Sequence, residues 1–182
     1  MKKSIMLTVT VITFSLVGIF LGQGYIKPSS AREESIWNIY LDNMKASIIN
    51  GNVFVPASPE LENTTIKAYD VLVSKRGDYA TFTFDVVNAG NIDANLSTLI
   101  KVEPKCISLE LPAIESDEEL VCNNLEYKVY YTNNNKEVNI SDTIKAHTKE
   151  NITIKVGLNE NISEDPKSDV QVTLFDMTLV YN

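Results

Sequence analysis

The chain has 182 residues and a formal net charge of −8 at neutral pH, and it contains one histidine, His147, and two cysteines. This acidity disfavours binding to nucleic acid, because phosphate backbones attract basic proteins. The scarcity of His and Cys, with no H-E-x-x-H or G-x-S-x-G sequence, excludes the usual zinc and serine hydrolase sites, so we expect a protein that is not an enzyme.

Residues 1–31 have the composition of an export segment. Lys2 and Lys3 precede a long apolar run, and no charged residue follows until Lys27. This layout is typical of a secretory signal peptide. The uncharged stretch 4–26 is also long enough for one hydrophobic helix to span a bilayer, which takes roughly 20 residues.

The fate of this segment has two open alternatives. Small residues at 29–31 favour cleavage of a signal peptide after Ala31, whereas a retained helix would be an N-terminal membrane anchor. Both place residues 32–182, as a single domain, in the extracellular space or on the cell surface, at the outer face of the cytoplasmic membrane. Cleavage would remove three of the 16 basic residues and no acidic one, so the net charge would become −11.

From Ser35 onward apolar and polar residues alternate, and turn-forming residues interrupt the alternation about every ten positions. Tyr79–Asn88 is the clearest strand, with Phe82, Phe84 and Val86 on one face. The other expected strands cover residues 37–42, 66–73, 94–102, 125–131, 152–158 and 170–181. Such strands without intervening helical patterns predict an all-β fold, a two-sheet antiparallel sandwich of roughly eight or nine strands with a jelly-roll or immunoglobulin-like order.

Two stretches depart from the strand pattern. Residues 50–63, with two prolines, predict a loop or an irregular edge. An acidic cluster predicts a solvated, charged loop. Its carboxylates are also a candidate calcium site, although they lack the D-x-D-x-D-G spacing of a dedicated calcium loop. The cluster consists of Glu115, Asp117, Glu118 and Glu119. We expect no other cofactor.

The two cysteines, Cys106 and Cys122, both lie in the part of the chain expected to be exported. Two cysteines in an oxidising compartment usually pair, and the C-x-x-C spacing of a redox site is absent. We expect a structural disulfide that holds a loop between strands, worth roughly 3 kcal/mol in the chain-entropy model.

Turn-forming residues flank the clearest strand on both sides. Gly77 and Asp78 precede it, and Asn88 and Gly90 follow it. Glycine permits the backbone conformation of a tight turn, and an Asp or Asn side chain can cap that turn. Arg76 completes an Arg-Gly-Asp tripeptide, the sequence that integrins bind. Because the turn already requires Gly77 and Asp78, we do not expect an integrin partner.

The pattern G-D-x-x-x-F-x-F-x-V-x-N-x-G-x-I-D-A over residues 77–94 resembles one found in the TasA/camelysin group. These are secreted β-sandwich proteins of Gram-positive bacteria that form biofilm-matrix fibres or coat cell surfaces. Generic bacterial immunoglobulin-like modules share the motif. The resemblance implies a jelly-roll subunit that assembles by strand donation, with the donor strand within Arg32–Ala46. Pairing of this segment within its own domain is the alternative.

Two functions fit these patterns best, while a hydrolase with a carboxylate pair from distant strands is a third alternative for which no supporting spacing is present. The first is an exported, non-enzymatic structural subunit of the cell surface or extracellular matrix, able to form fibres by N-terminal strand donation. The second is a membrane-anchored monomeric binding module for a protein or glycan partner. A sugar-stacking face is not expected, because the alternation leaves Tyr130 exposed alone. No L-P-x-T-G signal precedes Asn182, so we expect any tether to be N-terminal.

Overall fold

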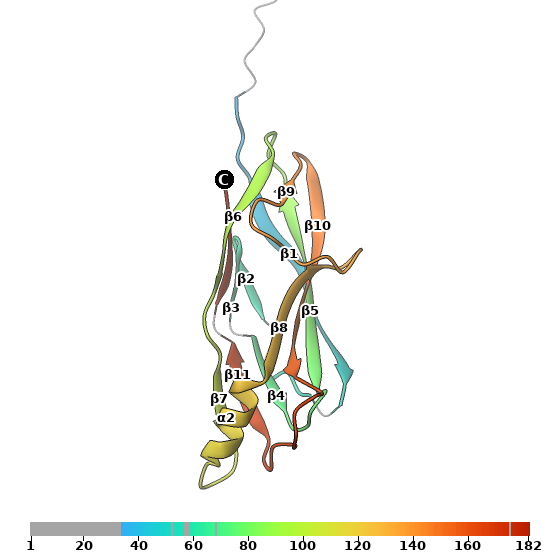
Figure 1. Ribbon diagram of the computed structural model, residues 1–182. Helices are drawn as coiled ribbons and strands as arrows, with labels where there is room; N and C mark the ends of the chain where they lie inside the picture. Colours follow the sequence, from blue (N-terminus) through green and yellow to red (C-terminus); the bar gives the residue numbers. More distant parts are fainter. Residues whose placement is uncertain (1–33, 52, 57–58, 68, 175) are drawn as a thin grey trace, which may run out of the picture. The chain divides into compact units, whose positions relative to one another are not determined.

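The alternating pattern forms an all-β fold in the computed structural model of the chain (Figure 1). The structure describes residues 34–182 except 52, 57–58, 68 and 175. The expected N-terminal hydrophobic helix, whether signal or anchor, lies outside the described residues. Within the described part, no helix is long and apolar enough to cross a membrane.

The secondary structure consists of short and long strands and, in the described part of the chain, one helix between β7 and β8. The strands are β1 (Ile39–Asn50), β2 (Glu60–Glu62), β3 (Thr65–Lys67), β4 (Tyr69–Val73), β5 (Tyr79–Asn88), β6 (Ala94–Lys101), β7 (Lys105–Ser108), β8 (Leu125–Tyr131), β9 (Thr143–Ile144), β10 (Thr148–Leu158), β11 (Val170–Leu174) and β12 (Met177–Tyr181). The helix is α2 (Glu115–Asn123).

The first layer is a four-stranded antiparallel sheet in the order β1-β5-β10-β8. Its centre confirms the predicted faces of the clearest strand. Phe82 and Phe84 are fully buried, and they pair across the sheet with Ile154 and Ile152 of β10, which are also fully buried. Facing apolar pairs of this kind fix the register of the two strands, because a slip of one residue would turn every side chain to the other face.

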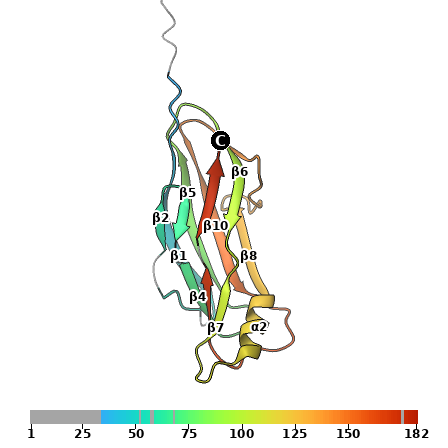
Figure 2. The same ribbon diagram turned by 90° about the vertical axis from the view of Figure 1, so that its left-hand side faces the viewer.

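The second layer consists of two antiparallel sheets, β4-β11-β7 and β2-β3-β12-β6-β9. The chain passes from one sheet to the other three times, between β3 and β4, between β6 and β7, and between β11 and β12. The lateral order is the same on both sides of the break, as Figure 2 shows for β4, β11 and β7. The layer is therefore a row of three long strands, each interrupted near its middle.

These interruptions correct the strand predictions. Residues 66–73 and 170–181 each form two strands instead of one, and the strand predicted over 94–102 is followed by the separate strand β7. The described residues accordingly contain twelve strands, in three hydrogen-bonded sheets, where eight or nine strands in two sheets were expected. Pro104, between β6 and β7, has no N–H to donate to a sheet, which accounts for one of the three breaks.

Strand β6 also departs from its predicted facing. Leu96 is buried and Leu99 packs against the core, whereas Ile100 is 49% exposed. The register explains this, because Thr98 pairs with Val180 while Leu96 pairs with the next residue of β12. One extra residue on β6 forms a β-bulge, which reverses the alternation between the faces.

The core is one cluster of apolar side chains drawn from both layers. β5 and β10 contribute to it from the first layer, and β4, β11 and β12 contribute Val71, Val172 and Leu179 from the second.

Trp37, predicted to open the first strand, precedes β1 and is 45% exposed. β1 ends at Asn50, and the described residues between there and residue 63 contain only the short strand β2 and a bridge between Phe54 and Leu72, so the predicted irregular edge is confirmed.

The loop predicted for the acidic cluster is wrong, because these residues lie in α2, and Glu115, Asp117 and Glu118 are in its first turn. Carboxylates near a helix N-terminus are favoured by the unpaired N–H groups there. Asp117 is only 3% exposed. Its Oδ2 accepts hydrogen bonds from the backbone N–H of Lys167 and from the N–H and hydroxyl of Ser168, each at 2.8 Å.

Replacement of Phe84 by Ala should lower the free energy of unfolding by about 3–5 kcal/mol, because it leaves a cavity among fully buried side chains. Urea denaturation followed by circular dichroism measures this change. Thr98→Ala, at an exposed position of β6, is the control and should stay within about 0.5 kcal/mol of the parent. An unchanged midpoint for the Phe84 variant would contradict the described core.

Candidate functional site

The predicted disulfide between Cys106 and Cys122 is present, and it joins β7 to α2. The bridge thus holds a helix, where a loop between strands was expected. Because β7 is the last strand of its sheet, its outer edge would otherwise be open. The Ser108 N–H donates to Glu118 Oε1 of the helix at 2.9 Å. The helix and its disulfide therefore cover a sheet edge, a common protection against unwanted strand pairing.

The double variant Cys106→Ser/Cys122→Ser should lose about 3 kcal/mol of unfolding free energy, since the bridge spans a sequence separation of 16 residues. Reduction of the parent protein should produce the same loss and should leave the double variant unchanged. The denaturation midpoints of the four samples measure this. Equal midpoints for oxidised and reduced parent would show that α2 holds its position without the bridge.

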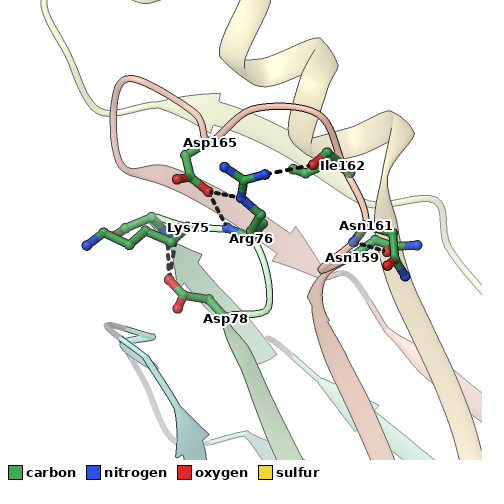
Figure 3. A network of polar contacts seen from close by, with 8 residues as sticks. Lys75, Arg76, Asp78, Asn159, Asn161, Ile162 and Asp165 are labelled. Carbon is green, nitrogen blue, oxygen red and sulfur yellow. Dashed lines mark hydrogen bonds and ion pairs between the residues drawn. The ribbon is translucent and has the colours of Figure 1, made fainter.

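The turn before β5 is closed by its own carboxylate (Figure 3). Gly77 has a positive φ of 78°, which favours glycine. Asp78 is 3% exposed, and its Oδ2 accepts the backbone N–H groups of Ser74 and Lys75 at 3.1 and 2.9 Å. The predicted capping role of Asp78 agrees with this geometry.

The arginine of the same turn points to a neighbouring loop. Arg76 Nε donates to Asp165 Oδ1 at 3.0 Å, and Nη1 donates to the Ile162 carbonyl at 3.0 Å. The Arg76 backbone N–H, which also donates to Asp165 Oδ1 at 3.0 Å, and the Nε bond hold the pKa of Asp165 below its ordinary value. With Asp78 buried and Arg76 bonded within the chain, the tripeptide serves the turn and is not displayed as an integrin ligand would be.

The turn after β5 receives the segment that leads into β1. The Asn88 side chain donates to the carbonyls of Ile92 and Ile144 and accepts the Gly90 N–H. A Cβ on Gly90 would lie 2.3 Å from the Ile36 carbonyl oxygen, so only glycine allows this close approach. Asn91 Oδ1 in turn accepts the Ile36 N–H at 2.7 Å.

Strand β1 lies at the edge of the first layer and pairs with β5 of its own chain. Leu41 is buried, and Ile39 and Met44 pack partly against the core. The register shifts between Asp42 and Lys45, where Asn43 has a positive φ of 56°. In the single chain, β1 therefore pairs within its own domain, which was the alternative to strand donation.

A polar centre links β1 to two other strands. Asp85 of β5 is 7% exposed. Its Oδ2 accepts Lys149 Nζ at 2.7 Å and Asn43 Nδ2 at 3.0 Å, and its Oδ1 accepts Asn151 Nδ2 at 2.9 Å. Burial alone would raise the pKa of Asp85, but these hydrogen bonds outweigh it and lower the pKa from 3.8 to about 2. The carboxylate is therefore charged at any physiological pH.

The remaining candidate site residues, the acidic cluster and the tyrosines of β8, do not come together in one site. Glu118 and Asp117 already bind backbone groups of the protein. In the described part of the chain, no three His, Cys, Asp or Glu side chains gather as a metal site would require, and the calcium hypothesis stays a prediction. Tyr130 is half-buried, while Tyr127 and Tyr131 pack against the core as expected.

The sequence did not predict a hollow of about 270 Å³ on the outer face of the first layer, lined by Tyr79, Glu126, Lys128 and Lys155 among others. Lys155 Nζ lies 4.4 Å from the centre of the Tyr79 ring and 3.3 Å from Glu126 Oε2. One face of the ring is thus already covered by a cation. Gly157 within a strand was the available sequence signal, because a Cβ there would meet Tyr79 at 2.3 Å.

No protein-family model, curated protein or solved structure matches this chain. The fold and the contacts above define an all-β sandwich protein with a disulfide-pinned helix over one sheet edge and an edge strand, β1, held by polar contacts. The β1 edge, with the turn at Asn88–Asn91 and the centre at Asp85, is the candidate functional site.

The contribution of Asp85 should appear as a pH dependence. Its folded-state pKa lies below the unfolded value, so its stabilisation is present above about pH 4 and is lost as the pH falls through about 2. The difference in unfolding free energy between the parent and Asp85→Asn should therefore shrink by about 2 kcal/mol between pH 5 and pH 2. Lys149→Met should reduce this pH-dependent difference, and Lys45→Met, an exposed lysine of β1, should not.

Proposed function

We propose that this protein is an exported, non-enzymatic structural subunit of the cell surface or extracellular matrix, and that copies assemble by exchanging β1. The observation that carries the proposal is the attachment of β1. This edge strand is placed by polar contacts, and among its described side chains only Leu41 is buried. The edge of β5 is the same in every copy, so β1 of a neighbour can make the same contacts.

The state of the other edges supports this choice of strand. The edge of β7 is covered by α2. The edge of β8 is partly covered by the following segment, because the Tyr131 N–H donates to Lys136 and the Val138 N–H donates to Val129. Protected edges resist pairing with another chain, so the covered edges at β7 and β8 are less suited to exchange than the junction of β1 with β5.

The strand order supports the jelly-roll arrangement. With each interrupted strand of the second layer counted once, β1, β3/β4, β5, β6/β7 and β8 alternate between the two layers. Jelly rolls cross between sheets in this way. The immunoglobulin fold instead places its first two strands in one sheet. The resemblance of residues 77–94 to the TasA/camelysin group supports the same interpretation and stays a hypothesis.

The disulfide supports export. Disulfides persist in extracytoplasmic compartments and are rare in the cytosol. The signal-like composition of residues 1–31 points the same way. A tethered protein and a released protein are both compatible with assembly through β1.

Strand exchange can be tested with cysteines placed at Tyr40 and Val87, which are cross-strand partners of β1 and β5. A chain carrying Tyr40→Cys is mixed with a chain carrying Val87→Cys under assembly conditions and then oxidised. Exchange places the two cysteines opposite each other on different chains, so a covalent heterodimer should form. Non-reducing electrophoresis with mass analysis measures it.

The matched control uses Lys128 and Lys155, which are partners of β8 and β10 on the same sheet. These strands stay in one chain, so mixing Lys128→Cys with Lys155→Cys should give no heterodimer above background. A lack of heterodimer for the β1 pair as well, from a protein that remains monomeric, would contradict the proposal. That outcome would favour a membrane-anchored monomeric binding module for a protein or glycan.

A further inference from the structure

Exposed apolar side chains gather at the end of the sandwich where the chain enters β1. Ile36 is 56% exposed, Trp37 45%, Ile92 38% and Tyr40 37%. Single exposed apolar residues are ordinary on a protein surface, but a group of them marks a contact with another surface.

Backbone contacts hold this group in place. The Asn91 N–H donates to the Ile36 carbonyl at 3.1 Å, and the Gly90 and Ala89 N–H groups donate to the Asn38 carbonyl at 3.2 and 2.8 Å. Ile36 and Ile92 are therefore fixed on adjoining stretches of one surface, which we call the entry end (residues 36–38 and 89–93). The apolar group is a built feature of this end and not a loose terminus.

Two ion pairs lie at or next to the entry end. Lys145 Nζ lies 2.7 Å from Asp93, and Lys149 Nζ lies 2.7 Å from Asp85. These pairs are neutral, whereas the chain as a whole carries a net charge of −8. A hollow of about 340 Å³ lined by residues that include Val87, Ala89 and His147 adjoins this end. The carboxylates of Asp93 and Asp85 beside the apolar group are thus each neutralised by a lysine, and the acidic residue Glu34 precedes the entry end in sequence.

We propose that the entry end rests on a lipid bilayer, with Ile36, Trp37 and Ile92 in the interfacial region. Nine residues separate the uncharged stretch 4–26 from Ile36, a link that spans at most about 35 Å. A bilayer that holds this stretch is therefore within reach of the entry end. Aromatic side chains with a polar edge, Trp above all, prefer the boundary between lipid and water.

This inference rests on the membrane-tethered form of the proposed function. It adds an orientation of the domain relative to the membrane. With the entry end on the bilayer, β1 runs from the membrane surface outward. Exposed apolar residues elsewhere, such as Ile107 at 49% exposure on β7, have no such link to a membrane segment. They provide the comparison for the test.

Trp37 is the only tryptophan of the chain, so its fluorescence reports on the entry end alone. The full chain is reconstituted into phosphatidylcholine vesicles and purified by flotation. Trp37 emission should shift to shorter wavelength than in the urea-unfolded chain. Lipid brominated near the headgroup should quench it strongly, and aqueous acrylamide should quench it weakly.

Ile92→Asn should weaken quenching by the brominated lipid, and Ile107→Asn, the matched control at a similarly exposed position, should not. Strong acrylamide quenching of a chain that floats with the vesicles would overturn the inference and leave strand exchange untouched. A chain that does not float would overturn both the tether and the inference. Strand exchange would still be decided separately by the mixed cysteine pairs.

Discussion

Strand β5 is the element on which the rest of the structure depends, because it is hydrogen bonded along both edges and covered on both faces. Phe82 and Phe84 fill the core, while the outward-facing Thr81 and Asp85 are also nearly buried. The turn before β5 holds a neighbouring loop through the bonds of Arg76. The turn after β5 holds the segment that enters β1 through backbone hydrogen bonds. The strongest local sequence motif, residues 77–94, encodes this strand and its two turns.

The two neighbours of β5 are attached by different kinds of interaction. β10 buries four apolar side chains, each worth about 1.5–3 kcal/mol when fully buried, whereas Leu41 is the one buried side chain among those described for β1. Hydrogen bonds such as that from Asn43 to Asp85 are directional and contribute about 1.5–3 kcal/mol when one partner is charged. They determine where β1 docks more than how tightly it binds. Exchange between copies needs this combination of a defined register and modest attachment.

Alternation predicted the strands well where one face meets the core, as in β5, β8 and β10, because burial alone decides the facing there. It failed where the backbone departs from regular pairing, at the bulge of β6 and at the breaks of the second layer, since no period in the sequence marks an extra residue. The acidic helix α2 looked like a loop because its charges satisfy backbone groups, which only the fold reveals. The turn residues of the site were predictable from local chemistry. The centre at Asp85 was not, because Asn43, Lys149 and Asn151 come from distant positions.

The disulfide and the polar attachment of β1 have complementary consequences for assembly. α2, held by its bridge, covers the edge of β7, which would otherwise be open to other strands; in the proposed assembly this would favour pairing at the β1 edge, whose register is specified. Retention of the N-terminal segment would confine copies to a plane and raise their effective concentration, which favours exchange between neighbours even when β1 binds modestly. Cleavage would remove that advantage and make exchange depend on bulk concentration. Under the proposed function, the processing of residues 1–31 would thereby decide where assembly begins, and the β1 edge would decide how it proceeds.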